Sequence, residues 1–221
     1  MHIVAVTPLS VSPEELARRQ RRYDRLAPVG VTVALHNLGT GRQIPRSLDT
    51  EEAIAASEAA VEDWFRSADG SGVDAFLPDC VLDPAVGLAG QQTGTPVLGI
   101  LRLTGHFLRG QGLRVGAVAR NESIARELNR KYASYGLGPL HEPTSVLGLS
   151  VDDIADDEKW AASIRGRVTA IEADVVINGC SAVETHSAGS GAILVDPTAL
   201  ALQLIGLAAA SGAVAFTGAG R

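Results

Sequence analysis

Two hydrophobic patterns alternate along this chain of 221 residues. Short apolar runs, typical of buried strands, are separated by longer segments in which apolar residues recur at helical spacing. The strand-like runs cover residues 2–6, 31–35, 75–78, 97–101, 113–118, 146–149, 174–178 and 192–195. The helix-like segments cover residues 13–26, 50–67, 123–135, 157–173 and 197–210. Strands alternating with helices predict an α/β fold with mostly parallel sheets.

The strand–helix–strand–helix–strand order occurs twice, which indicates an internal repeat. We therefore expect two similar lobes, each a mostly parallel sheet flanked by helices, related by a pseudo-twofold axis with the active site between them. The predicted first lobe is 1–105 and the second is 106–195, with a boundary in the glycine-bearing segment 105–112. The remaining segment, 196–221, is predicted to form a C-terminal helix that packs back on the first lobe.

The repeat is most evident in two segments that each end in one of the two cysteines of the chain. Residues 74–80 read DAFLPDC and residues 174–180 read DVVINGC, so each runs from Asp through an apolar stretch to Cys. In parallel α/β sheets, ligands bind beyond the carboxyl ends of strands. We therefore expect Cys80 and Cys180 to face one small-molecule substrate from the two lobes.

Paired thiols suit an enzyme that inverts a carbon next to a carbonyl group. Inversion needs a base on one face of the carbon and an acid on the other, and a thiolate and a thiol can fill and exchange these roles. Each cysteine could instead be a small apolar residue at the end of a buried strand, but two copies in a repeat favour catalysis. The five histidines form no ligand-spaced cluster with the thiols, so no metal site is expected.

Composition and charge narrow the class of protein. Hydrophobic residues make up 46% and charged residues 20%, as in a soluble enzyme, and the net charge of −6 disfavours nucleic acid or membrane as a partner. The chain has no signal-peptide pattern and no run long enough to span a membrane, so a cytoplasmic protein is expected. The one dense basic cluster, residues 18–22, is interpreted as a solvated helix face.

Several motifs resemble those of a known family. Residues 80–86, CVLDPAV, resemble the Cys-x-x-Asp-Pro-Gly-Leu signature of hydantoin racemases and differ from the Cys-Asn-Thr signature of glutamate racemases. Residues 44–48 resemble the Pro-x-Ser-Ile loop, and residues 96–100 and 195–197 also match. Over nearly its full length the chain resembles the aspartate/glutamate/hydantoin racemase superfamily, and within it the hydantoin racemase branch.

This resemblance implies an isomerase that works without pyridoxal phosphate, metal or other cofactor, and that forms a homo-oligomer. It implies proton transfer at the α-carbon of a hydantoin, amino acid or related acid, with Cys80 and Cys180 as the opposed acid and base. The residues expected to hold the substrate oxygens are Thr7, Ser47 and Ser181 through their hydroxyls, Val81 and Ala182 through their backbone amides, and Thr104 as a pocket-lining residue.

The chain departs from the family where the second lobe usually carries a threonine at a strand end. Here that position reads Ala119-Arg120-Asn121, so one expected hydroxyl is missing and the polar end of the substrate is held differently. Glu184 and His186 follow Cys180 closely enough to tune its pKa or to lie in a solvent-facing loop.

Three aspartates near the cysteines and the last helix are interpreted as structural. Asp79 precedes Cys80, and a carboxylate beside a thiol would raise the thiol pKa rather than activate it. Asp83 and Asp196 each precede a proline, the pattern of an N-cap followed by the first residue of a helix.

Two other functions stay open. A thiol-dependent cis–trans isomerase or decarboxylase acting on a dicarboxylate would use the same pair of residues, because a thiolate can also add covalently to a substrate. A non-catalytic protein that binds a small ligand on the duplicated fold is the alternative outside enzymes.

Overall fold

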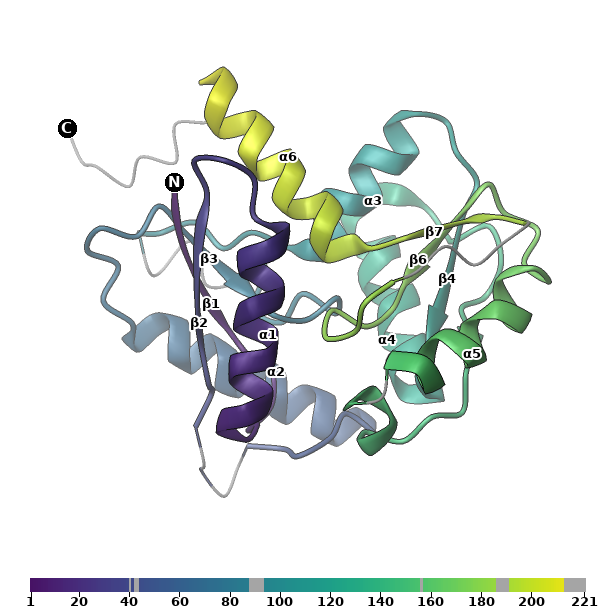
Figure 1. Cartoon of the computed structure of the whole chain (residues 1–221), viewed down its shortest axis with the longest axis horizontal. Helices are drawn as coiled ribbons and strands as arrows, with labels where there is room; N and C mark the ends of the chain where they lie inside the picture. The colour runs from purple at the N-terminus through teal and green to yellow at the C-terminus, as the bar shows by residue number, and fades with distance from the viewer. Residues whose placement is uncertain (40, 42–43, 88–93, 156, 186–190, 213–221) are drawn as a thin grey trace.

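The computed structural model describes residues 1–39, 41, 44–87, 94–155, 157–185 and 191–212. They form two α/β lobes side by side, joined along the middle of the molecule (Figure 1). Each lobe contains a parallel sheet with helices on both faces, as the sequence predicted.

The first lobe has a three-stranded sheet in the order β2-β1-β3. Its elements are β1 (His2–Val6), α1 (Pro13–Leu26), β2 (Thr32–His36), α2 (Glu51–Ser67) and β3 (Ala75–Pro78). Side-chain oxygens cap the N-termini of α1 and α2. Ser12 accepts a hydrogen bond from the backbone N–H of Glu15, and Thr50 accepts one from that of Ala53. Each cap is the residue directly before the first residue of its helix.

The second lobe has a four-stranded sheet in the order β5-β4-β6-β7. Its strands are β4 (Val115–Ala119), β5 (Ser145–Val146), β6 (Val175–Asn178) and β7 (Ile193–Val195). The helical elements of this part of the chain are α3 (Ile100–Gly110), α4 (Glu122–Tyr132), the π-helical turn η2 (Ala133–Leu137), the 3-10 helix η3 (Asp152–Ala155) and α5 (Asp157–Val168). The final helix, α6 (Pro197–Ser211), follows β7 and packs on the first lobe.

The strands read as continuous apolar runs because both faces of each sheet are covered. Successive side chains of a strand point to opposite faces. In β1, Ile3 and Ala5 pack with α1 and α6, whereas Val4 and Val6 pack with α2 on the other face. In the second lobe, α3 and α4 cover one face of the sheet and α5 covers the other.

One core cluster crosses from the first lobe into the second. It joins Cys80 and its neighbours Val81 and Leu82 to residues of β4 and α4, such as Ala119 and Ile124. Helix α6 makes a second connection, since Leu202 and Ile205 share a core cluster with β1. Figure 1 shows α6 running from the end of β7 across the molecule to the first lobe. The exact division of the chain at residue 105 stays a prediction.

The predicted strand 97–101 is wrong. Only a bridge forms there: Phe76 pairs with Val97, and helix α3 starts at Ile100. The Asp83 carboxylate caps the N-terminus of this helix, because it accepts hydrogen bonds from the backbone N–H groups of Leu101 (3.0 Å) and Arg102 (2.8 Å).

Asp83 therefore caps a helix that begins 17 residues further along the chain, not a helix beginning at Pro84. Residues 81–82 and 84–87 after Cys80 form turns instead, and Asp83 itself has a positive φ of 49°. Gly99 permits the contact, because a Cβ there would lie 2.4 Å from Asp83 Oδ2. The proline pattern alone does not distinguish a local cap from a distant one.

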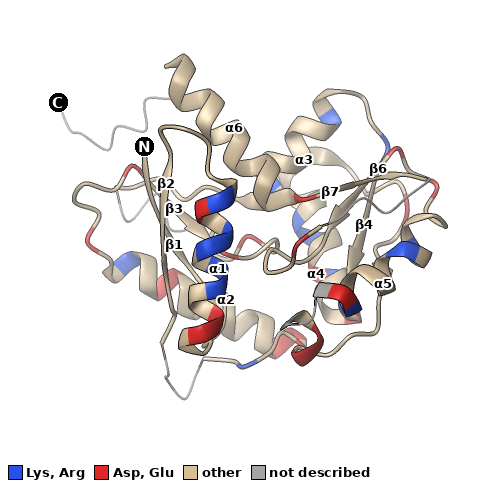
Figure 2. Ribbon diagram, in the orientation of Figure 1, with Lys and Arg blue, Asp and Glu red and all other residues tan. Residues whose placement is uncertain are grey.

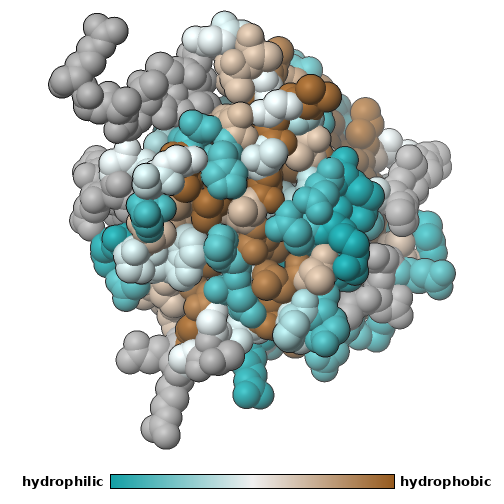
Figure 3. All heavy atoms as spheres, turned by 60° about the vertical axis from the view of Figure 1, so that its left-hand side comes forward, coloured by the Kyte–Doolittle hydropathy of each residue, from teal (hydrophilic) through white to brown (hydrophobic). Residues whose placement is uncertain are grey.

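The surface of the described part of the chain mixes polar and apolar residues, as Figure 3 shows for one face. The large exposed apolar side chains are Val29, Phe107, Ile193 and Leu207. None of the helices in the described ranges combines the length and apolar character needed to cross a membrane.

We expect Asp83→Ala to lower the free energy of unfolding by about 2 kcal/mol, because α3 loses the two hydrogen bonds that the Asp83 carboxylate accepts at its N-terminus. Urea denaturation measures this change. Asp69→Ala is the matched control: Asp69 is exposed and accepts one hydrogen bond from Ser71, so its loss should cost about 0.5 kcal/mol or less. Equal effects of the two substitutions would contradict the assignment of Asp83 as the cap of α3.

Candidate active site

The two cysteines occupy equivalent positions in the two lobes. Each lies two residues beyond the end of a strand that pairs with the first strand of its lobe, Cys80 after β3, which pairs with β1, and Cys180 after β6, which pairs with β4. The residue before each cysteine donates its backbone N–H to a carbonyl of the neighbouring strand, from Asp79 to Val6 and from Gly179 to Val118, both at 2.8 Å. The repeat in the sequence therefore corresponds to a repeat in the hydrogen bonding that places the thiols.

Both cysteines line the same small cavity, of about 50 Å³, where the lobes meet. Its polar lining residues are Arg19, Asp79, Cys80, Arg120, Cys180 and Ser181, and the others are Pro8, Leu9, Leu48, Val81, Leu82, Ile124, Val151, Ile154, Gly179 and Ala182. The walls are therefore largely apolar, with a few polar groups near the thiols, as in many small-molecule sites.

Local contacts hold the two cysteine segments together. The Ser181 hydroxyl donates to the backbone carbonyl of Asp79 at 2.9 Å, which links the residue after one cysteine to the residue before the other. Gly179 allows β6 to end close against β4, since a Cβ at this position would lie 2.2 Å from the Val118 carbonyl oxygen. A larger residue here would displace Cys180.

Asp79 is buried beneath the cavity with two partners from α1. Its carboxylate accepts from Arg19 Nη1 at 2.9 Å and from the Tyr23 hydroxyl at 2.8 Å. Arg19 also donates through Nε to Glu15, so its guanidinium is held between two carboxylates. The interpretation of Asp79 as structural was incomplete, because the residue also lines the cavity and affects both thiols.

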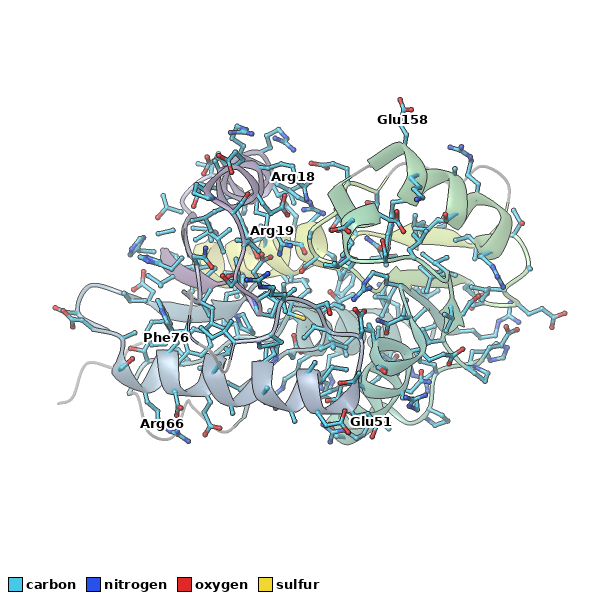
Figure 4. All side chains as sticks on the ribbon, turned by 90° about the horizontal axis from the view of Figure 1, so that it is seen from below. Arg18, Arg19, Glu51, Arg66, Phe76 and Glu158 are labelled. Carbon is cyan, nitrogen blue, oxygen red and sulfur yellow. The ribbon has the colours of Figure 1, made fainter. Side chains whose placement is uncertain are left out.

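The basic cluster 18–22 is only in part a solvated helix face, because Arg21 is exposed whereas its neighbours contact other parts of the molecule. Arg18 donates to the carbonyl of Ala182 at 2.8 Å, and Arg22 donates to that of Val183 at 2.9 Å and to Asp196 at 2.6 Å. Arg19 and Arg22 are buried. Figure 2 shows the basic residues along α1, and Figure 4 shows Arg18 and Arg19 on the side of α1 that faces the second lobe. Arg18 and Arg22 bind the segment after Cys180 to the first lobe.

Burial raises the pKa of the Cys80 thiol to about 12. A backbone hydrogen bond from Leu82 opposes this shift, whereas the nearby groups Asp79, Cys180 and Asp83 add to it. With three anionic or potentially anionic neighbours, Cys80 is favoured as the protonated thiol.

Burial also raises the pKa of the Cys180 thiol, but its surroundings differ. A backbone hydrogen bond from Ala182 lowers this pKa, and so do the charges of Arg19 and Arg120, while Asp79 raises it. Two guanidinium groups thus favour the thiolate of Cys180, and carboxylates disfavour that of Cys80. The site is symmetric in its backbone and asymmetric in its charges.

Of the six residues predicted to hold the substrate, the structure brings Val81, Ser181 and Ala182 to the cavity. Two of them already have partners. The Ser181 hydroxyl bonds to Asp79, and the amide of Ala182 bonds to the sulfur of Cys180. In the first lobe the amide that bonds to the cysteine sulfur is that of Leu82.

The other three predicted residues are not among those that line the cavity. Thr7 is buried, donates to the carbonyl of Leu9 at 2.7 Å and accepts from the amide of Leu38. Thr104 is buried between α3 and α6 and donates to the carbonyl of Pro197 at 3.1 Å. Ser47 is half-buried and hydrogen-bonds with Asp49. Backbone and side-chain partners hold all three hydroxyls.

Sequence reasoning did not assign Arg19 and Arg120 to the site. Helical periodicity places Arg19 on a polar face of α1. The pattern does not show whether that face is exposed to water or packs against the second lobe. For Arg120 a signal exists, because it follows a strand at the position where the family usually has threonine. Glu184 pairs with Arg25 of α1, and His186 lies outside the described residues.

A metal-binding cluster is not found in the part of the chain that the structure describes. There, no group of three or more His, Cys, Asp or Glu side chains is arranged to hold an ion.

Comparison with known proteins agrees with this geometry. The family model of Asp/Glu/hydantoin racemases matches residues 24–205. Comparison with curated protein sequences finds no match. Structural comparison gives allantoin racemase from Klebsiella pneumoniae with a TM-score of 0.72, 18% identity, and coverage of 96% of this chain and 89% of that one.

Two further solved structures are similar in fold. Aspartate racemase from Picrophilus torridus has a TM-score of 0.62 and 16% identity, covering 95% of each chain. Arylmalonate decarboxylase has a TM-score of 0.57 and 19% identity, covering 93% of each chain.

A two-lobed α/β scaffold with a thiol just beyond the end of a strand in each lobe defines the class of this protein. The chain belongs to the Asp/Glu/hydantoin racemase family, and it is an enzyme of the racemase type.

We expect Arg22→Met to lower the free energy of unfolding by about 3 kcal/mol, because it leaves the buried Val183 carbonyl and Asp196 without this cation. Chemical denaturation measures the loss. Arg25→Met is the matched control from the same helix, since Arg25 is 59% exposed and pairs with Glu184 at the surface. Its expected effect is about 0.5 kcal/mol. Similar losses in both variants would show that α1 does not hold the second lobe through Arg22.

We expect the two thiols to ionise at different pH values. In single-thiol variants, the rate of alkylation by iodoacetamide follows the thiolate fraction. Cys80, studied in Cys180→Ser, should still react about tenfold faster for each pH unit up to pH 10, because its pKa is about 12. Cys180, studied in Cys80→Ser, should reach its midpoint at lower pH, because Arg19 and Arg120 favour its thiolate. A lower midpoint for Cys80 would contradict the charge asymmetry of the site.

Proposed function

We propose that this enzyme inverts a carbon α to a carbonyl group by transferring protons between two thiols. The observation that carries the proposal is that Cys80 and Cys180, one from each lobe, line a single cavity. Family membership supports the reaction class. The substrate class is an amino acid, a hydantoin or a related acid, small enough for its reacting end to enter this cavity.

In one direction, the thiolate of Cys180 removes the α-proton. The electrons of the broken C–H bond move into the carbonyl group and form an enolate, and Cys180 becomes a thiol. The thiol of Cys80 then donates its proton to the opposite face of the carbon, and the carbonyl re-forms. The product has the opposite configuration, and the two sulfurs have exchanged protonation states.

Two features of the cavity support this assignment of roles. The charges around the thiols make Cys180 the more acidic of the two, so Cys180 is the thiol that ionises first and supplies the base, whereas Cys80 keeps its proton as the acid. The largely apolar walls limit water around the enolate, and a charged intermediate interacts more strongly with fixed donors where water is excluded. In the opposite reaction direction, Cys80 must be the thiolate and Cys180 the thiol.

We expect Cys80→Ser and Cys180→Ser each to lower the rate of racemisation by about 10²- to 10⁴-fold, the range typical of a general acid or base. Single enantiomers of aspartate, glutamate, 5-methylhydantoin and 2-phenylpropionate are incubated in D₂O. Proton NMR follows loss of the α-proton, and optical rotation follows inversion.

The control in this experiment is the unfolding midpoint of each variant, which should stay close to that of the wild type. Inversion that survives in either serine variant would refute the two-thiol mechanism. If the wild type inverts none of these compounds, malonates and alkene dicarboxylates test the decarboxylase and cis–trans isomerase alternatives. Binding without any turnover would favour a ligand-binding protein.

A further inference from the structure

Arg120 differs from the other polar groups of the cavity in having a buried donor without a partner. It is 3% exposed and lines the cavity together with both cysteines. Its Nε–H makes no hydrogen bond in the structure. Buried polar groups in proteins nearly always have a partner, so an exception in a cavity needs an explanation.

The remaining contacts fix the guanidinium in place. Nη2 forms an ion pair with the Asp49 carboxylate at 2.7 Å, and Nη1 donates to the carbonyl of Leu149 at 3.3 Å. The amide of Leu149 in turn donates to the carbonyl of Arg120 at 3.1 Å. The side chain is therefore held from both lobes, and Nε is left for a group that enters the cavity.

The second arginine of the cavity has no such role. Arg19 bonds through Nε to Glu15 and through Nη1 to Asp79, so two carboxylates already engage it. Asp49, the carboxylate paired with Arg120, is half exposed to water and therefore neutralises the charge of Arg120 less completely.

The position of Arg120 in the repeat places this donor in one lobe only. Arg120 follows β4 as Thr7 follows β1, and the two strands are the centres of their sheets. Thr7 is directed into the first lobe, where Leu9 and Leu38 satisfy its hydroxyl. Among the described residues that line the cavity, none from the first lobe has an equivalent donor without a partner.

We propose that Arg120 is a substrate-binding residue that selects compounds with an anionic oxygen group, a carboxylate, next to the reacting carbon. A guanidinium binds carboxylate oxygens more strongly than neutral carbonyls, and more so in an apolar cavity. This inference rests on the proposed function, because it concerns the compound on which the two thiols act. It favours an amino acid or related acid over a neutral hydantoin.

The test compares matched acids and neutral compounds. The acids are N-carbamoyl-alanine and 2-phenylpropionate, and their neutral partners are 5-methylhydantoin and 2-phenylpropionamide. Binding is measured by calorimetry, and α-proton exchange in D₂O gives kcat and KM. The wild type should bind at least one acid more tightly than its neutral partner. Arg120→Gln should raise the Kd and KM of that acid at least about 10-fold while changing those of the neutral partner by about 2-fold or less.

Two further variants separate binding from stability. Arg120→Lys keeps the charge and should retain part of the preference for acids. Asp49→Asn removes the ion-pair partner but leaves the guanidinium in the cavity, so it should retain the full preference for acids. Loss of the preference in Asp49→Asn with a normal unfolding midpoint would contradict the proposal.

The results distinguish this inference from the proposed function. Weaker binding of acids by Arg120→Gln, without α-proton exchange by the wild type, would support the role of Arg120 and refute racemisation of these compounds. Exchange by the wild type that Arg120→Gln leaves unchanged, or reduces equally for acids and neutral partners, would refute the role of Arg120 only. Failure of the wild type to bind either acid would also refute it.

Discussion

The hydrogen bonds from helix α1 to the segment after Cys180 are the interaction on which the site depends. Each lobe supplies one thiol, so the distance between the thiols is set by how the lobes are joined. Arg18 and Arg22 bond to the carbonyls of Ala182 and Val183, and Arg22 also pairs with Asp196 at the start of α6. Because Arg22 is buried, its contacts are screened less by water than a surface pair. They place the Cys180 segment against the first lobe, next to Cys80.

The same helix also sets the charges at the thiols. Arg19, one position from Arg18, pairs with Asp79 beneath the cavity and favours the thiolate of Cys180. Asp79 disfavours the thiolates of both cysteines. The backbone around the two cysteines is thus repeated in the two lobes, but the charged side chains around them are not. The two thiols therefore occupy equivalent positions but differ in acidity, with Cys180 the more acidic of the two.

Much of the fold followed from the sequence, and the errors have a common cause. The N-cap of α6, Asp196, was found because the cap and the amides that donate to it lie within one turn. The cap of α3 was missed because Asp83 lies far from it along the chain, and a pattern of adjacent residues contains no such information. The hydroxyls of Thr7 and Thr104 were assigned to the site by resemblance, but backbone carbonyls within reach of them engage these groups instead.

The sequence by itself determined the repeated order of strands and helices and the two thiols at strand ends, because both are local patterns of apolar and polar residues. Only the tertiary structure decided where the polar faces point. The same helical pattern is compatible with an arginine that is exposed to water and with one that packs against a second lobe. The burial of Arg19 and Arg22 therefore depends on how the lobes pack. The same holds for Arg120, which lines the cavity between the lobes and pairs with Asp49 of the first lobe and Leu149 of the second.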